Sequence, residues 1–260
     1  MKSIGLALGG GGARGVAHIA YLSALEDMGC KPDIIAGTSS GAIIGALYAG
    51  GMSPGDMYSM LESLFSIKKR SGISLVKALK RNNVAAALAK QFLSSVLPKK
   101  TFEELDIPLK LVATNFNTLQ EKVFTTGEIL PALMGSIAYP SVFLPQQAGE
   151  AYYIDGGATN IVPFDILRKH CDMLIAIDVS KVRTNTLKPS RKNAHHATWA
   201  ATQEALVALK LEKTPVEIFE RPTFEDVSMM EFFKYKSIYK RAQIHIPGFV
   251  EQLNKVLMKG

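Results

Sequence analysis

Two glycine-rich turns near the N-terminus constrain the fold of this chain more than any other feature. The first turn, residues 9–15 (GGGGARG), follows the apolar run Ile4–Leu8. The second, residues 37–41 (GTSSG), follows the apolar run Ile34–Ala36. An apolar run that ends in glycines and leads into a helical pattern is typical of a strand, a tight turn and a helix. This repeated order predicts an α/β fold with a mainly parallel sheet covered by helices on both faces.

The second turn has the G-x-S-x-G pattern and places Ser39 at its apex. Gly37 and Gly41 allow a sharp backbone bend, so the serine hydroxyl is held out of the fold as a nucleophile. The first turn offers backbone N–H groups at the start of a helix, where an oxyanion or a phosphate is stabilised. A nucleophile together with an anion site is the pairing that ester cleavage requires.

Nucleotide binding is the main competing interpretation of the first turn. Gly10, Gly12 and Gly15 satisfy the spacing of the dinucleotide fingerprint, which by itself is a weak signal. That fingerprint expects an acidic residue at the end of the second strand to bind a ribose hydroxyl, but here the strand leads into Gly-Thr-Ser. A Walker-type site fails as well, because no Gly-Lys-Ser/Thr follows the glycines. These departures argue against a nucleotide site.

A serine nucleophile also needs a base. His170 is the only reasonable candidate for a Ser-His-Asp triad, and its place between an expected helix (Phe164–His170) and a buried strand favours a structural role. Asp155 fits better, because it ends a short apolar strand and two glycines follow it. An aspartate of ordinary pKa is a feeble base at neutral pH, so Asp155 would need partial burial to raise its pKa. The alternative is a turn residue, since Asp-Gly is a common turn signal.

The length of 260 residues allows one large α/β domain. We expect residues 1–180 to form the catalytic domain and residues 181–260 to form a mainly helical part packed on the same domain.

Glycines interrupt the long uncharged stretch at 34–55, which favours a strand, a turn and a buried helix over a membrane span. Arg14 and His18 interrupt the N-terminal apolar run, so a signal peptide is not indicated. We expect a cytoplasmic protein, peripheral to the inner membrane face if it meets a membrane at all.

Positive charge gathers in residues 66–100, which contain no acidic residue. Apolar residues lie among the basic ones at the spacing of an amphipathic helix. We interpret the segment as a basic helical cap that either exposes a solvated face or contacts anionic lipid headgroups. Nucleic acid is not expected as a partner, because the segment lacks the aromatic residues interleaved with basic ones that stacking platforms use. The basic residues are Lys68, Lys69, Arg70, Lys77, Lys80, Arg81, Lys90, Lys99 and Lys100.

The motifs together resemble the patatin-like phospholipase family. GGGGARG, GTSSG and the DGG at 155–157 occur in that family's order, and residues 136–145 are similar to its segment before the catalytic aspartate. The resemblance covers roughly residues 4–170. It implies a three-layer α/β/α fold of the patatin-like (FabD/lysophospholipase-like) kind. It also implies a serine–aspartate dyad that acts on lipid acyl esters and requires no metal or organic cofactor.

Carried over by position, the resemblance makes Ser39 the nucleophile and Asp155 the base that takes its proton. Water activated by Asp155 would then release the fatty acid from the acyl-enzyme. We therefore predict a serine acyl hydrolase of the phospholipase A, lysophospholipase or esterase type. An acyltransferase with the same acyl-enzyme, or a catalytically silent lipid-binding regulatory protein, is the alternative. The amides of Gly10, Gly11 and Gly12 would form the oxyanion hole, and the supporting loop residues would be Arg14, Gly15, Gly37, Gly41, Gly156 and Gly157.

Overall fold

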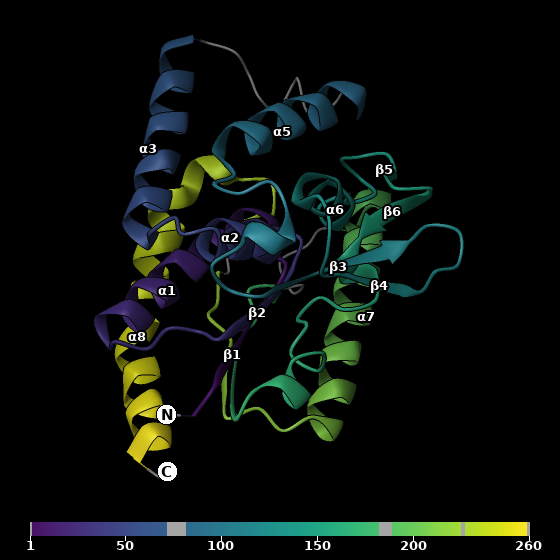
Figure 1. The fold of residues 1–260 in the computed structure, drawn as a ribbon. Helices are drawn as coiled ribbons and strands as arrows, with labels where there is room; N and C mark the ends of the chain where they lie inside the picture. The colour runs from purple at the N-terminus through teal and green to yellow at the C-terminus, as the bar shows by residue number, and fades with distance from the viewer. Residues whose placement is uncertain (1, 72–81, 182–188, 225–226, 259–260) are drawn as a thin grey trace.

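The computed structural model of the protein describes residues 2–71, 82–181, 189–224 and 227–258 (Figure 1). An eight-stranded sheet has the order β5-β6-β3-β2-β1-β7-β8, and β4 pairs with β3. The predicted parallel arrangement is confirmed for five consecutive strands, and antiparallel pairing adds the other three at one side. The parallel strands are β1 (Ile4–Leu8), β2 (Ile34–Thr38), β3 (Leu109–Asn115), β7 (Met173–Ile177) and β8 (Ile218–Glu220); the added strands are β4 (Glu121–Phe124), β5 (Gln146–Ala148) and β6 (Ala151–Asp155).

Helices cover both faces of this sheet, as predicted (Figure 1). One face carries α1 (Ala17–Asp27), α2 (Ser40–Ala49), α3 (Pro54–Ser71), α5 (Asn82–Val96), α6 (Ile129–Ser136) and α8 (Tyr235–Met258), and the other face carries α7 (Arg191–Lys213). Short 3-10 helices are η1 (Gly12–Val16), η2 (Phe102–Glu104), η3 (Gly156–Ala158), η4 (Arg168–His170) and η5 (Phe232–Lys234). Within the described ranges, none of the helices has the length and hydropathy of a membrane-spanning segment.

The alternation of side chains along the strands divides the core between the two faces. Leu6 and Leu8 pack with the helices of the larger layer, whereas Ala7 between them packs on the opposite side with Val207 of α7. Successive side chains of a strand point to opposite faces, so a strand that is covered on both sides must be apolar throughout. All five residues of β1 are buried accordingly.

Strand β3 explains how two segments far apart in the sequence meet. It pairs with β4 over Leu111–Thr114, so β2 and β6 must share its other edge. The parallel strand β2 ends with Thr38 opposite Val112. The antiparallel strand β6 ends with Asp155 opposite Ala113. The carboxyl ends of β2 and β6 therefore face each other at adjacent positions of β3, and the residue after Thr38 lies beside Asp155.

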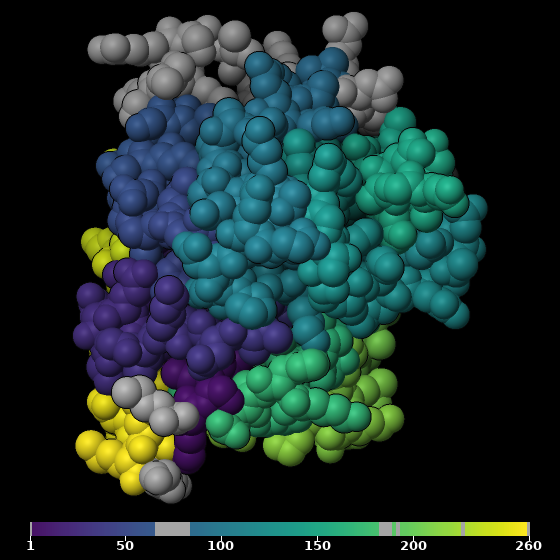
Figure 2. Space-filling view, in the orientation of Figure 1, coloured from purple at the N-terminus to yellow at the C-terminus, as the bar shows by residue number. Residues whose placement is uncertain are grey.

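Two segments differ from the expected elements or lie partly outside the described residues. Phe164–His170, expected as a helix, forms a series of i→i+3 turns that ends in η4, and lacks the i→i+4 bonds of an α-helix. The basic segment at 66–100 contains the end of α3 and all of α5, whereas its residues 72–81 lie outside the described part of the chain. In the space-filling view the residues of α5 lie between those of α3 and those around α6 (Figure 2).

Candidate active site

Ser39 occupies the sharp turn between β2 and α2. Its φ of 53° and ψ of −121° place a non-glycine residue in a strained backbone conformation, which persists only where the surroundings hold it. Here Ser39 donates its N–H to the Oγ of Ser136, at 2.9 Å, from the end of α6. The turn also packs tightly, because a Cβ on Gly41 would collide with the carbonyl oxygen of Leu8 in β1. The G-x-S-x-G segment thus forms the strained turn that its sequence predicts.

Asp155 lies directly beside this serine. The hydroxyl of Ser39 donates to Oδ2 of Asp155 at 2.7 Å, and the amide of Gly157 donates to Oδ1 at 2.7 Å. The carboxyl is 3% exposed. Burial raises its pKa from the ordinary 3.8 to about 6, and the two donated hydrogen bonds limit the rise. Burial thus gives Asp155 the raised pKa that a base at this position would need.

The other base considered from the sequence is far from Ser39. His170 is exposed at the end of η4, just before β7, whose Met173 pairs with Ile4 at the amino end of β1. Ser39 follows the opposite, carboxyl end of the parallel strands. Five residues of strand separate the two edges by roughly 15 Å. The structure therefore does not bring His170 to the serine.

The glycine loop at 9–15 passes beside Ser39, but its three candidate amides are not equivalent. The amide of Gly10 donates to the carbonyl of Ile161 at 2.9 Å, so it is already engaged. The amides of Gly11 and Gly12 have no acceptor among the residues that the structure describes. Gly12 has a φ of +59°, and a Cβ there would overlap the backbone of Met229. Within the described part of the chain these two N–H groups can thus meet an anion at this loop.

Two buried basic side chains, Arg14 and His18, contact backbone carbonyls of the loop. Arg14, which is 2% exposed, donates from Nε to the carbonyl of Gly11 at 3.2 Å and from Nη1 to that of Lys181 at 2.7 Å. Burial lowers the pKa of Arg14 to about 10, and nearby Asp178 opposes the change, so the guanidinium stays charged at neutral pH. His18, fully buried, contacts the carbonyl of Gly9 through Nε2 at 2.8 Å. Burial lowers its pKa to about 4, so a neutral ring donates this bond.

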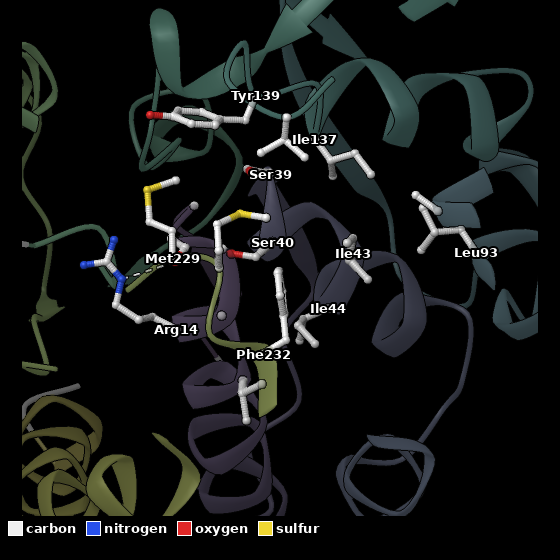
Figure 3. A pocket seen from close by; sticks show the side chains of 18 of the residues that line it. Arg14, Ser39, Ser40, Ile43, Ile44, Leu93, Ile137, Tyr139, Met229 and Phe232 are labelled. Carbon is white, nitrogen blue, oxygen red and sulfur yellow. Dashed lines mark hydrogen bonds between the residues drawn. The ribbon is translucent and has the colours of Figure 1, made fainter. Parts of the chain in front are cut away.

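A cavity of about 720 Å³ opens over Ser39 and Asp155. This volume is typical of pockets for drug-sized ligands. Most lining side chains are apolar and come from α2, α3, α5 and the segment 137–143. Figure 3 shows Ser39 between two parts of the lining, with Ile43 and Leu93 to one side and Arg14 and Met229 to the other. The cavity can therefore bring an apolar ligand to the serine hydroxyl.

Several residues that position this site carry no motif. Ser136 holds the backbone of Ser39, and Gln203 of α7 donates to the carbonyl of Gly157 at 3.3 Å. Tyr139 and Trp199 line the cavity and meet edge to face with ring centroids 5.4 Å apart. The sequence places Ser136 and Tyr139 in the segment similar to the patatin-like family, which was their only signal. Nothing in the sequence distinguishes Gln203 or Trp199 from other residues of a helix.

The apolar side of the amphipathic pattern in the basic segment faces the cavity. In α5 the apolar stripe of Ala85, Leu88, Ala89, Phe92 and Leu93 lines the cavity, and Ala85 and Leu93 are buried.

Among the described residues, no group of three or more His, Cys, Asp or Glu side chains is placed to hold a metal ion.

Comparison with known families and sequences identifies the relatives of this chain. The family model described as patatin-like phospholipase matches residues 6–168. Lysophospholipase NTE1 of Phaeosphaeria nodorum is 26% identical over 98% of this chain and 19% of its own length. An NTE family protein of Mycobacterium tuberculosis is 30% identical over 73% of this chain and 32% of its own length. The chain thus spans a third or less of these relatives.

Comparison with solved structures supports the fold. The crystal structure of VipD from Legionella pneumophila matches with a TM-score of 0.58 at 14% sequence identity. The match covers 96% of this chain and 66% of that one. At this identity the likeness is one of fold alone.

Proposed function

Because this chain belongs to the patatin-like phospholipase family, we propose that it is a serine hydrolase of lipid acyl esters that uses Ser39 as nucleophile and Asp155 as base. One observation carries the proposal: the Ser39 hydroxyl donates to a buried carboxyl at 2.7 Å, at the floor of an apolar cavity. The relatives named lysophospholipase support a single-chain phospholipid as the substrate class. Catalysis through Ser39 and Asp155 would proceed in two steps.

In the first step Oγ of Ser39 attacks the acyl carbonyl while Oδ2 of Asp155 takes its proton. The C–O bond to the alcohol then breaks, the proton passes to the leaving oxygen, and an acyl-enzyme remains. In the second step Asp155 takes a proton from water, the hydroxide attacks the acyl carbonyl, and the fatty acid leaves as Ser39 regains its proton. The pKa near 6 suits both transfers, since the carboxyl is mostly ionised at neutral pH yet basic enough to accept a proton.

The oxyanion of each tetrahedral intermediate would lie against the glycine loop. The amides of Gly11 and Gly12 support this role because they have no acceptor within the described part of the chain. Gly10 takes part only by giving up its bond to Ile161. One good donor of this kind contributes roughly 3 kcal/mol to the transition state. The amino end of α2, which begins directly after Ser39, adds a favourable partial positive charge.

A fluorophosphonate probe tests the nucleophile directly. We expect the probe to label the wild-type protein, because it forms a covalent adduct with an activated serine, and to leave Ser39→Ala unlabelled. Ester hydrolysis should fall by at least about 10⁴-fold in the same variant. The matched control is Ser63→Ala on the exposed side of α3, which should label and hydrolyse like the wild type.

Unlabelled wild-type protein with an intact circular dichroism spectrum would contradict the hydrolase and favour the silent lipid-binding alternative. Products of acyl transfer to an added alcohol, in place of free fatty acid, would favour the acyltransferase.

We also propose that the basic cap contacts anionic membranes. Val84 and Leu88 of α5 are each 40% exposed, and Leu88 lies at the cavity as well, so an apolar surface continues from the cavity to the outside. Reversal of Lys68, Lys69 and Arg70 to Glu should weaken flotation with phosphatidylglycerol vesicles at least tenfold, because each cation near a charged surface contributes about 1 kcal/mol. Binding that is equal on phosphatidylcholine vesicles, or unchanged by the reversal, would refute the contact.

A further inference from the structure

The cavity extends to both sides of Ser39, and the two sides differ in chemistry. One side runs beneath α3 and α5 and is mostly apolar; the other is lined by Trp199 and Gln203 of α7. Arg14 and Tyr139 lie together on one side of Ser39 (Figure 3). Building on the proposed hydrolase, we propose that substrate binds in one orientation only, with its acyl chain beneath α3 and α5 and its polar alcohol part against Trp199. Residues of α5 then determine chain-length selectivity, and Trp199 determines selectivity for the alcohol.

The direction of α2 is the reason for placing the acyl chain beneath α3 and α5. This helix begins after Ser39 and turns Ile43, Ile44 and Leu47 toward the cavity, at the spacing of one helical face. Leu47 lies eight residues after Ser39, which is roughly 12 Å along the helix at 1.5 Å per residue. Apolar side chains of α3 and α5 close this length from the opposite side. A mostly apolar space that starts at the nucleophile fits an extended acyl chain, and its few polar side chains, Gln91 and Ser95 of α5, leave most of its surface unsuited to hydroxyl or phosphate groups.

The alcohol side carries the aromatic rings and polar groups that are rare on the acyl side. The rings of Tyr139 and Trp199 meet at 89°, and the Tyr139 hydroxyl lies 3.1 Å from Nδ1 of His196. Arg14 also belongs to the cavity lining and stays charged at neutral pH, with its guanidinium bound to the carbonyls of Gly11 and Lys181. Aromatic faces together with polar groups suit the glycerol and phosphate of a polar lipid alcohol.

Trp199 also has a second cavity behind it. A space of about 230 Å³ is lined by His195, Thr198, Thr202 and the Gly157 turn, and it shares Trp199 and Gln203 with the main cavity. The indole ring therefore forms part of the wall between this second space and the site of reaction. Removal of the ring would enlarge the alcohol side without touching the acyl side, which makes the two selectivities separable by mutation.

Two substitutions test the orientation. Ala89→Phe adds a ring to the α5 stripe, where the 720 Å³ cavity has room for it. Its matched control is Ala87→Phe, the same change on the exposed face of the same helix. Trp199→Ala opens the alcohol side, and its control is Leu209→Ala, an exposed position of α7.

Each variant is measured with two pairs of esters in Triton X-100 mixed micelles. The kcat/KM ratio of p-nitrophenyl palmitate to p-nitrophenyl butyrate reports on the acyl chain. The ratio of 1-palmitoyl-lysophosphatidylcholine to methyl palmitate reports on the alcohol, because both substrates share one acyl chain. We expect Ala89→Phe to lower the first ratio at least tenfold and leave the second within twofold. Trp199→Ala should do the reverse, and both controls should keep the wild-type ratios.

The orientation would be overturned if the two effects were exchanged. In that case Trp199→Ala would alter chain-length preference and Ala89→Phe would alter alcohol preference. Ratios that stay at wild-type values in both variants would also overturn it, because the lining would then have no part in substrate recognition. Failure of the hydrolase itself looks different, since wild-type protein would hydrolyse none of the four esters.

Discussion

The floor and the roof of the cavity are built in opposite ways. The floor consists of the backbone turns at 9–15, 37–41 and 155–157, where glycines lie against neighbouring backbone or side-chain atoms with little or no space for a Cβ. The roof consists of α3 and α5, whose apolar side chains face a space large enough to accept added atoms. Reactive groups need fixed backbone positions, whereas a chain of methylene groups needs only apolar surface of the right shape. We therefore expect substitutions in the floor to remove activity and substitutions in the roof to alter selectivity.

After Ser39→Ala, the largest effect is expected from the neutral isostere Asp155→Asn. Without a base for Ser39, turnover should fall by about 10³- to 10⁴-fold, measured as kcat on p-nitrophenyl butyrate. The stability should change in the opposite direction. Burial raises the pKa of Asp155 above its value in the unfolded chain, so the folded state binds the proton more tightly and loses stability as the pH rises from about 4 through 6.

Asn carries no charge, so the Asp155→Asn variant does not lose stability as the pH rises through this range. At pH 8 the variant should gain about 1–3 kcal/mol in free energy of unfolding, and at pH 4 the gain should vanish. In the wild type the same pKa predicts that kcat falls tenfold for each pH unit below about 6. Asp106→Asn, an exposed position, is the control and should change neither property. An active Asp155→Asn variant would exclude this carboxyl as the base.

A glycine pair compares floor and roof with one chemical change. Gly41→Ala would push its Cβ into the Leu8 carbonyl, and we expect a loss of about 3 kcal/mol or more in urea unfolding, together with loss of activity. Gly55→Ala in the first turn of α3 meets open space, with the nearest atom 3.8 Å away. It should stabilise the protein by about 0.5–1 kcal/mol, because alanine restricts the unfolded chain. Equal effects of the two changes would contradict the distinction between the regions.

The smallest expected loss of activity concerns Ser136, which accepts the hydrogen bond of the Ser39 amide in the strained turn. Ser136→Ala removes the acceptor for the Ser39 amide, so we expect kcat to fall about tenfold with KM unchanged, and the unfolding free energy to fall by about 1–2 kcal/mol. Ser63→Ala on α3 again provides the control. A rise in KM with unchanged kcat would show instead that Ser136 shapes the substrate site and does not position the nucleophile.

Sequence reasoning recovered the parts of this site that depend on local backbone. The turn at Ser39 follows from its glycines, because few other residues fit between β1 and α2. The segment at 164–170 was predicted wrongly as a helix, because its apolar pattern fits either a helix or a run of buried turns. The stripe of α5 was recognised from its spacing, but spacing cannot show what the stripe covers, and in the structure it faces the cavity.

By itself, the sequence determined which backbone turns form and which residues they place at their apices, since glycine spacing and strand–helix order act over a few residues. Only the tertiary structure decided that β6 meets β2 end to end on β3, which brings Asp155 within 2.7 Å of Ser39 and buries it enough to raise its pKa. It also decided that the amide of Gly10 is engaged while those of Gly11 and Gly12 have no acceptor among the described residues. Distances between segments, burial and the pairing of buried polar groups depend on how distant elements pack, and no local pattern specifies them.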